Sequence, residues 1–130
     1  MSTCNKPHRY DEKFKNLSNS QAGEGRHLCC GCAYEQGIED AKAEKIAKFK
    51  PEKIKFSQAG VVRHKDPEEA YELGYKEEYI RKAYEQGKSD AEARKEAKFK
   101  PKEINFIETK IVSYKDVEKA YKRGYDENKK

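Results

Sequence analysis

Four cysteines and three histidines carry the metal-binding chemistry that this sequence offers. Cys29, Cys30 and Cys32 fall within the stretch HLCCGC, and near the N-terminus the stretch CNKPH holds Cys4 and His8. The first residues show no signal peptide and no apolar run long enough to cross a membrane, so we expect a cytosolic, cytoplasmic chain. In a reducing compartment, cysteines bind metals or do redox chemistry more often than they form structural disulfides.

The Cys29-x-x-Cys32 pair has the spacing of two zinc ligands held in one small loop. We expect the pair at the start of a helix, where backbone N–H groups and the helix dipole favour thiolates. Zinc in structural sites takes four Cys or His ligands, so two more must come from elsewhere. The sequence predicts a Zn²⁺ site formed by Cys4, His8, Cys29 and Cys32.

Two other residues are alternates for this ligand set. His27 lies two residues before Cys29, but His64 follows the same Ser-Gln-Ala-Gly motif without a cysteine nearby. Arg-His therefore has some reason to occur there without a metal. Cys30 would give a four-cysteine site. A redox pair, an iron–sulfur cluster and inert buried thiols remain rivals, although no βαβ setting and no ferredoxin spacing accompany the cysteines.

The two ligand pairs resemble those of a treble-clef-like zinc module, in which one pair lies in a loop and the other at a helix N-terminus. The resemblance is one of motif and covers Cys4 to about Phe49. It implies a zinc knuckle at the N-terminus. Cys4-x3-His8 departs from the Cys-x-x-Cys knuckle of that family.

The chain also matches itself at two shifts. At a shift of 50, residues 33–80 lie on 83–130 with 25 of 48 positions identical, including AYEQG and AKFKP. At a shift of 37, Cys29 and Cys32 lie on Asp66 and Glu69. The matches predict three repeat units within one compact domain. Residues 1–50 hold the zinc module and first unit, 51–100 the second unit with a long helix, and 101–130 a truncated third.

Each unit is expected to contain two short strands and then a helix, which gives an α+β fold of tandem strand-turn-strand-helix repeats with the zinc knuckle in front. The strand signal is apolar alternation followed by a short apolar run, at Ile54 and Phe56 with Val61–Val62, and at Ile104 and Phe106 with Ile111–Val112. The helix signal is Asp-Pro-Glu-Glu, where Asp66 caps, Pro67 opens the helix and Glu69 closes a capping box.

After Pro67, no proline interrupts residues 66–99, which allows one long helix, with a break near Gly74 or Gly87 left open. We expect the helices to end at the KFKP stretches, before Pro51 and Pro101. Ala-Tyr-x-x-Gly occurs four times and is typical of a face where another helix backbone approaches closely. Self-association as a homo-oligomer through these faces is left open.

Basic residues recur around the KFKP stretches and the preceding turns. The net charge is +5, from 29 basic and 24 acidic residues, which permits nucleic-acid binding without demanding it. A solvated face with lysines near helix C-termini is the simpler reading. The DNA- or RNA-binding hypothesis rests on Arg26, Lys48, Lys50, Lys53, Lys55, Arg63, Lys98, Lys100 and Lys102.

No known catalytic motif occurs, and a zinc ion with four protein ligands is structural rather than catalytic. The sequence therefore favours a small zinc-binding repeat protein that acts as a nucleic-acid-binding module. One alternative is a protein-interaction or inhibitor protein in a phage or mobile-element defence setting. Another is a small nuclease that uses Arg26, His27 and His64.

Overall fold

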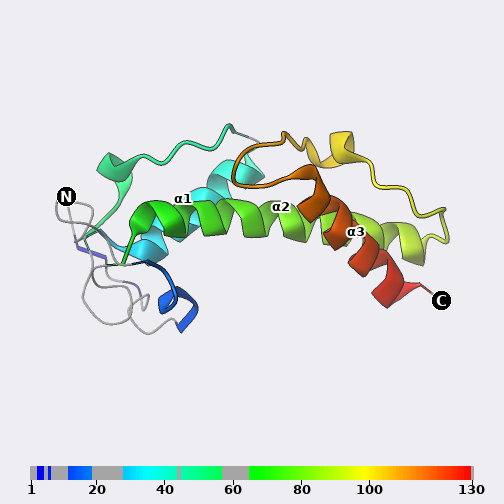
Figure 1. Ribbon diagram of the computed structural model, residues 1–130, viewed down its shortest axis with the longest axis horizontal. Helices are drawn as coiled ribbons and strands as arrows, with labels where there is room; N and C mark the ends of the chain where they lie inside the picture. Colours follow the sequence, from blue (N-terminus) through cyan, green and yellow to red (C-terminus); the bar gives the residue numbers. More distant parts are fainter. Residues whose placement is uncertain are drawn as a thin grey trace. The chain divides into compact units, whose positions relative to one another are not determined.

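The computed structural model describes residues 3–4, 6, 12–18, 28–43, 45–56 and 65–129. These ranges contain the α-helices α1 (Cys30–Lys42), α2 (Pro67–Glu92) and α3 (Tyr114–Asn128), and the short 3₁₀ helices η2 (Glu12–Phe14), η4 (Pro51–Lys53) and η6 (Pro101–Ile104) (Figure 1). The chain forms two compact units, Met1–Tyr75 and Lys76–Lys130, and α2 contributes to both. No helix in these ranges is long and apolar enough to cross a membrane. The three-module division at residues 50 and 100 stays a prediction.

The predicted α+β fold of strand-turn-strand-helix repeats is wrong, because the described residues contain helices and no strand. Isolated bridges join Phe56 to Thr3 and to Leu28. The apolar alternation at Ile54 and Phe56 contains only two apolar residues. Such a pattern fits an extended segment lying across helices as well as it fits a paired strand.

The predicted strand residues of the third repeat unit lie in a 3₁₀ helix, a loop and a turn. Ile104 ends η6, and Phe106 packs edge-on against Tyr79 with ring centroids 5.9 Å apart. The run Ile111–Val112 is part of a turn, because the Thr109 hydroxyl accepts both of its backbone N–H groups at 3.1 and 3.2 Å. The remaining run, Val61–Val62, lies outside the described residues.

Helix starts follow local side-chain chemistry. The Asp66 carboxylate accepts the N–H of Glu68 at 2.9 Å, and Pro67 opens α2, as predicted. The capping box at Glu69 is replaced, because its carboxylate accepts the N–H of Ser18 at 3.3 Å while Asp66 N–H donates to Ser18 O at 2.8 Å. A complete capping box instead opens α3, between Ser113 and Asp116.

Helices α1 and α2 end before the KFKP stretches, earlier than the sequence predicts. α2 runs unbroken through Gly74 and Gly87 and stops at Glu92. Arg94 then adopts a left-handed conformation with φ of 57°, and Lys95 N–H donates to Asp90 O at 2.9 Å. This is the hydrogen-bond pattern of a Schellman ending. Residues 45–50 and 95–100, which we name the first and second return segments, therefore follow α1 and α2 without helical structure.

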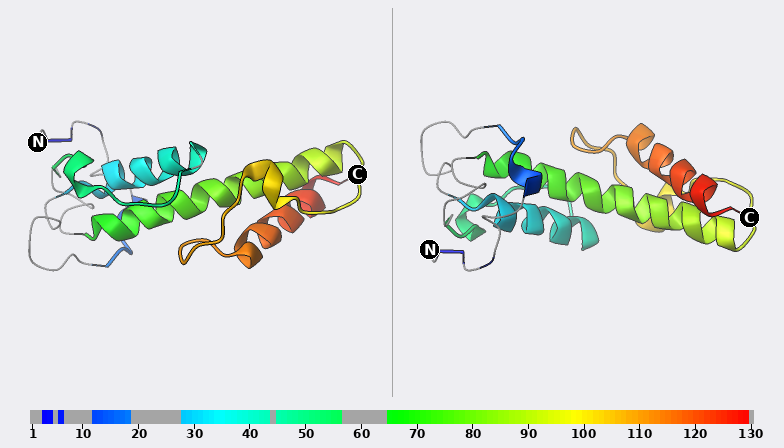
Figure 2. Two further views of the ribbon diagram at one scale, coloured as in Figure 1. Left: turned by 90° about the horizontal axis from the view of Figure 1, so that it is seen from above. Right: turned by 90° about the horizontal axis from the view of Figure 1, so that it is seen from below.

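The Ala-Tyr-x-x-Gly boxes pack helices against each other, as predicted. In the first unit, a Cβ on Gly37 would collide with the backbone carbonyl of Tyr71, and one on Gly74 with that of Tyr34. α1 and the first half of α2 therefore touch backbone to backbone (Figure 2). In the second unit, Gly87 and Gly124 make the corresponding contacts with the carbonyls of Tyr121 and Tyr84.

Tyrosine hydroxyls tie each return segment to its helix pair. The Tyr121 hydroxyl donates to Asp90 at 2.6 Å and accepts the N–H of Lys98 at 2.9 Å. The Tyr125 hydroxyl donates to Lys95 O at 2.5 Å. The same bonds occur 50 residues earlier, from Tyr71 to Asp40 and Lys48 and from Tyr75 to Lys45. Both helix pairs thus hold a return segment by tyrosine hydroxyls.

Replacing Tyr121 by Phe is expected to lower the free energy of unfolding by about 1–3 kcal/mol. The change removes a hydrogen-bond donor to Asp90, which is 5% exposed, and the acceptor of the Lys98 N–H. Urea unfolding followed by circular dichroism measures the loss. Tyr114→Phe, at a residue 40% exposed, makes the same chemical change as a control. Equal stability of the two variants would contradict the prediction.

Stability is also expected to fall in alkaline solution. Burial and the hydrogen bond to Asp90 raise the pKa of Tyr121 from its ordinary value of 10 to about 12. Because the folded-state pKa exceeds the unfolded one, this stabilisation is complete below about pH 10 and is lost as the pH rises towards 12. Urea unfolding over this pH range measures the decline. The Tyr121→Phe variant should lose less of its free energy of unfolding over the same pH range. An identical decline in the two proteins would show that ionisation of Tyr121 is not its cause.

Candidate metal centre and neighbouring pocket

Three cysteine sulfurs converge in the first unit. The Sγ atoms of Cys4, Cys29 and Cys32 all lie within 4.8 Å of one another. Cys4 and Cys29 are 2% and 1% exposed, and Cys32 is half-buried. None of the four cysteines, all of which lie in described residues, forms a disulfide. This group could hold a metal ion.

Helix α1 presents two of the three sulfurs, as the sequence predicts. Cys29 is the N-cap residue of α1, and Cys32 lies one turn inside the helix. The Cys29 side chain makes no capping hydrogen bond of the kind that Asp66 makes at the start of α2. Because Cys29 is the N-cap residue, it lies at the positive end of the helix dipole, where a thiolate or a metal-bound thiolate is favoured.

Residues 55–56 bring Cys4 to the helix. Cys4 N–H donates to Phe56 O at 2.9 Å, and Cys29 N–H donates to Lys55 O at 2.8 Å. One short piece of backbone thus holds both cysteine-bearing segments. The Lys6 N–H in turn points at the Cys4 sulfur, 3.4 Å away. The thiolate is the form of cysteine that binds metals.

The neighbouring sulfurs oppose the ionisation of Cys32. A hydrogen bond to Cys29, together with burial, raises the pKa of the Cys32 thiol far above its ordinary range. A coordinated metal cation reverses this effect, because a coordinating thiol is deprotonated outright. Lys6 forms an ion pair with Glu35 at 3.0 Å, and both side chains are solvent-exposed.

Cys30 is not part of the group of three. It is 0% exposed and belongs to the apolar core with Phe14, Leu17 and Ala33. Burial raises the pKa of its thiol to about 12, so the thiol stays neutral. Such a cysteine acts as a small apolar side chain. The structure therefore does not bring the alternate ligand Cys30 to the other sulfurs.

Several predicted site residues lie outside the described residues. These are the candidate ligands His8 and His27 and the candidate nucleic-acid contacts Arg26 and Arg63. The lysines predicted to bind nucleic acid are all described. Lys50 and Lys100 are half-buried, and the others are exposed, namely Lys48, Lys53, Lys55, Lys98 and Lys102.

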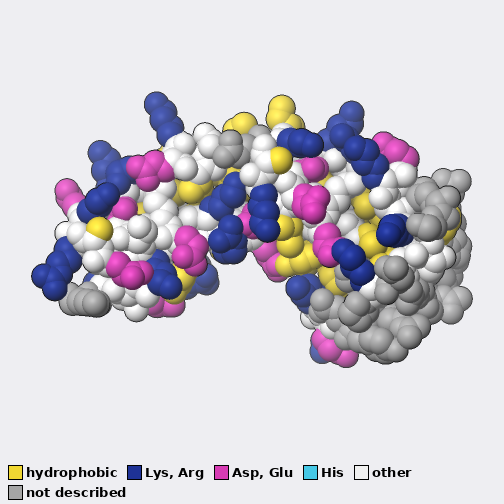
Figure 3. Space-filling model, turned by 180° about the vertical axis from the view of Figure 1, so that it is seen from behind, with side chains coloured by type: hydrophobic (Ala, Val, Ile, Leu, Met, Phe, Trp, Pro, Cys, Tyr) yellow, Lys and Arg dark blue, Asp and Glu magenta, His cyan; other side chains and the backbone are white. Residues whose placement is uncertain are grey.

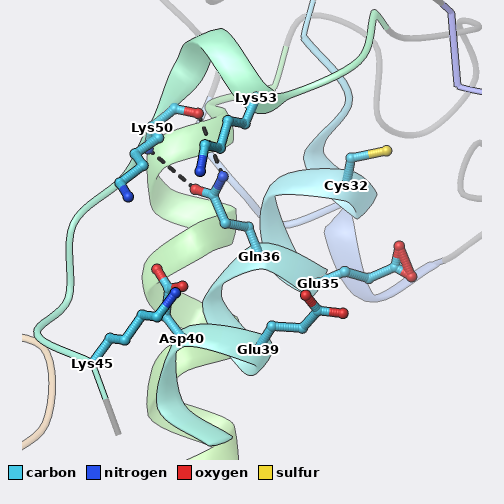
Figure 4. A pocket seen from close by; sticks show the side chains of 8 residues that line it. All are labelled: Cys32, Glu35, Gln36, Glu39, Asp40, Lys45, Lys50 and Lys53. Carbon is cyan, nitrogen blue, oxygen red and sulfur yellow. Dashed lines mark hydrogen bonds between the residues drawn. The ribbon is translucent and has the colours of Figure 1, made fainter. Parts of the chain in front are cut away.

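A pocket with a volume of about 320 Å³ adjoins the metal centre, since Cys32 forms part of its wall. Its other wall residues come from α1, from the first return segment and from η4 (Figure 4). Gln36 lies in this wall and bonds both backbone groups of Lys50, accepting its N–H at 3.1 Å and donating to its carbonyl at 3.4 Å.

Gln36, Asp40 and Lys45 were not predicted as site residues from the sequence. A signal for the first two was present, because both are identical to their counterparts at the shift of 50, Gln86 and Asp90. Both pairs hold a return segment in place. No comparable signal marked Phe56, since its contribution is a backbone carbonyl.

Comparisons with protein families, with curated proteins and with solved structures found no match to this chain.

Proposed function

We propose that the chain is a small zinc-binding module whose metal ion ties the N-terminal segment to the start of α1. The observation that supports it is the meeting of the Cys4, Cys29 and Cys32 sulfurs within 4.8 Å. Two ligands come from one helix terminus and the third from a distant segment, which is how a structural metal links parts of a small fold. A histidine completes the tetrahedral set, with His8 as the first candidate and His27 as the second.

Zinc is favoured over other metals by the donor atoms. Thiolate sulfur suits zinc, copper(I) and iron–sulfur clusters, and imidazole is a common partner of sulfur at zinc. The cysteine spacing does not match ferredoxin runs. A third cysteine beside Cys29 and Cys32 also fits a metal better than a simple redox pair, which needs only two sulfurs.

Elemental analysis of protein purified without chelator tests the site. One zinc per chain is expected. Cys29→Ser should lose it while keeping the helix start, because serine is a good N-cap residue but not a soft sulfur ligand. Cys30→Ala is the matched control and should keep the metal. Zinc that persists in Cys29→Ser, or no metal in the unaltered protein, would refute the proposal.

The same measurement on two histidine variants identifies the fourth ligand. Loss of zinc in His8→Ala but not in His27→Ala assigns His8, and the reverse result assigns His27. Retention in both leaves the three cysteines with a ligand from another source.

A second proposed function, nucleic-acid binding, is supported by how the lysines of the return segments are held. Backbone bonds fix these segments, as Lys48 N–H donates to the Tyr71 hydroxyl at 2.8 Å and Lys98 N–H to the Tyr121 hydroxyl at 2.9 Å. The backbone of these lysines is therefore ordered while their side chains are exposed, and lysines dominate salt-dependent contacts with phosphates. Acidic side chains are interspersed among the basic ones on the face shown in Figure 3, so the surface is not uniformly basic.

An electrophoretic mobility shift assay at two salt concentrations tests this second function with single-stranded and duplex DNA and RNA. Binding that weakens steeply with salt is expected. Failure to bind any of these probes at low salt would exclude the function. Co-purification of a stoichiometric protein partner in its place would favour the protein-interaction alternative.

A further inference from the structure

Three lysines line the pocket beside the metal centre. Lys45 and Lys50 come from the first return segment and Lys53 from η4, and together with α1 they surround a volume of about 320 Å³. This volume falls within the range of pockets that bind small molecules. In Figure 4, Lys50 and Lys53 lie beside Gln36 at one end of the pocket, and Glu35 and Glu39 extend at the other.

The backbone of each lysine is fixed before any ligand arrives. Lys45 N–H donates to Asp40 O at 2.9 Å, and Lys53 N–H donates to Lys50 O at 3.1 Å. The Gln36 amide bonds both the N–H and the carbonyl of Lys50. Because the backbone is already ordered, a ligand needs to order only the side-chain ends, which lowers the entropic cost of binding.

Two of the three acidic residues of the pocket have partners outside it, and the third, Glu39, lies with Glu35 at the end away from Gln36 (Figure 4). Lys6 pairs with Glu35 at 3.0 Å, and Asp40 accepts the Tyr71 hydroxyl at 2.6 Å. By contrast, none of the three pocket lysines forms an ion pair with another described residue. The end of the pocket beside Gln36 therefore carries positive charge.

The second unit provides an internal comparison, because its corresponding place lacks this arrangement. Lys100 lies 50 residues after Lys50 and is paired with Asp90 at 3.7 Å. The residue 50 positions after Lys53 is Glu103, which reverses the charge. The Gln86 amide still bonds both backbone groups of Lys100, at 2.9 Å each, so the backbone frame is present without the free cations.

We propose that the pocket of the first unit binds a phosphate group, through the ammonium groups of Lys50 and Lys53 beside Gln36. A phosphate takes charge-assisted hydrogen bonds from several lysines at once. The proposal builds on the nucleic-acid function proposed above, since a terminal phosphate of an oligonucleotide is one source of this group. A free phosphate-bearing compound is the other source.

Calorimetric titration of the full chain, purified with its metal, tests the pocket with inorganic pyrophosphate at low ionic strength. Lys53→Glu, which copies the residue at the corresponding place in the second unit, is expected to weaken binding at least about tenfold. The Lys115→Gln, Lys119→Gln double variant on α3 also lowers the net charge by two and should change affinity by less than about twofold. Circular dichroism confirms that both variants fold.

A parallel titration with one oligonucleotide, with and without a 5′-phosphate, separates the two sources. Preference for the phosphorylated form, lost in Lys53→Glu, supports a terminal phosphate as the ligand. Pyrophosphate binding without oligonucleotide binding supports the pocket and refutes the nucleic-acid function. Oligonucleotide binding that ignores both the 5′-phosphate and Lys53→Glu refutes the pocket alone. Absence of pyrophosphate binding, or an equal loss in the control variant, also overturns the pocket.

Discussion

A Gly87→Ala variant is expected to lose about 3 kcal/mol of the free energy of unfolding, even though alanine is the better helix former. The added Cβ would collide with the backbone carbonyl of Tyr121 and come within 2.9 Å of the Tyr125 backbone nitrogen. Neither atom can rotate away as a side-chain end could. The two helices must therefore move apart, which strains the hydroxyl bonds of both tyrosines.

Urea unfolding measures this loss, and Ser89→Ala is the matched control. Ser89 is exposed on the same helix, two residues further on, so its replacement reports helix propensity without the collision. The control should be as stable as the unaltered protein or slightly more so. If Gly87→Ala were also unchanged, the backbone contact between α2 and α3 would not be as close as described.

Removing the metal is expected to release the first unit while leaving the second folded. The site joins Cys4 to the start of α1, whereas the second unit carries no cysteine and opens α3 with a complete capping box. Because metal binding in small sulfur sites is largely folding energy, a chelator should lower hydrogen-exchange protection in α1 on the order of 100-fold. Amides of α3 should keep their protection.

Hydrogen exchange read by mass spectrometry on peptides from α1 and α3 measures the two responses in one sample. Re-addition of zinc should restore protection in α1, and Cys29→Ser should resemble the chelated protein without any chelator. Equal loss of protection in both helices would show that the metal stabilises the whole chain. Unchanged protection in α1 would show that the metal, if bound, is not structural.

The helix starts could be predicted because their chemistry is local. Asp66 and Pro67 are adjacent in sequence, and a cap needs nothing more distant than the next two residues. The same reasoning placed Cys29 and Cys32 at the start of α1. Cys4 lies with them in space because residues 55–56 hold both segments. It could be proposed as a ligand from its residue type and its Cys-x3-His spacing to His8.

The helix ends and the return segments could not be predicted in the same way. Lysine and phenylalanine in KFKP are compatible with a helix. Hydrogen bonds from residues distant in sequence hold this stretch in a non-helical conformation. Gln36 and Tyr71 hold the first return segment from positions 14 and 23 residues away. The strand prediction failed for the same reason, since two alternating apolar residues do not reveal whether a strand or a helix lies beneath them.

The two hydrogen bonds between the Gln86 amide and the Lys100 backbone affect how the protein aggregates at high concentration. The glutamine amide donates to and accepts from one residue, as a neighbouring β-strand would. Exposed backbone edges invite other chains to add as strands and aggregate. In this fold a side chain from a helix already fills that place, at Lys50 and again at Lys100. Each glutamine thus occupies the backbone N–H and carbonyl that a strand from another molecule would need for pairing.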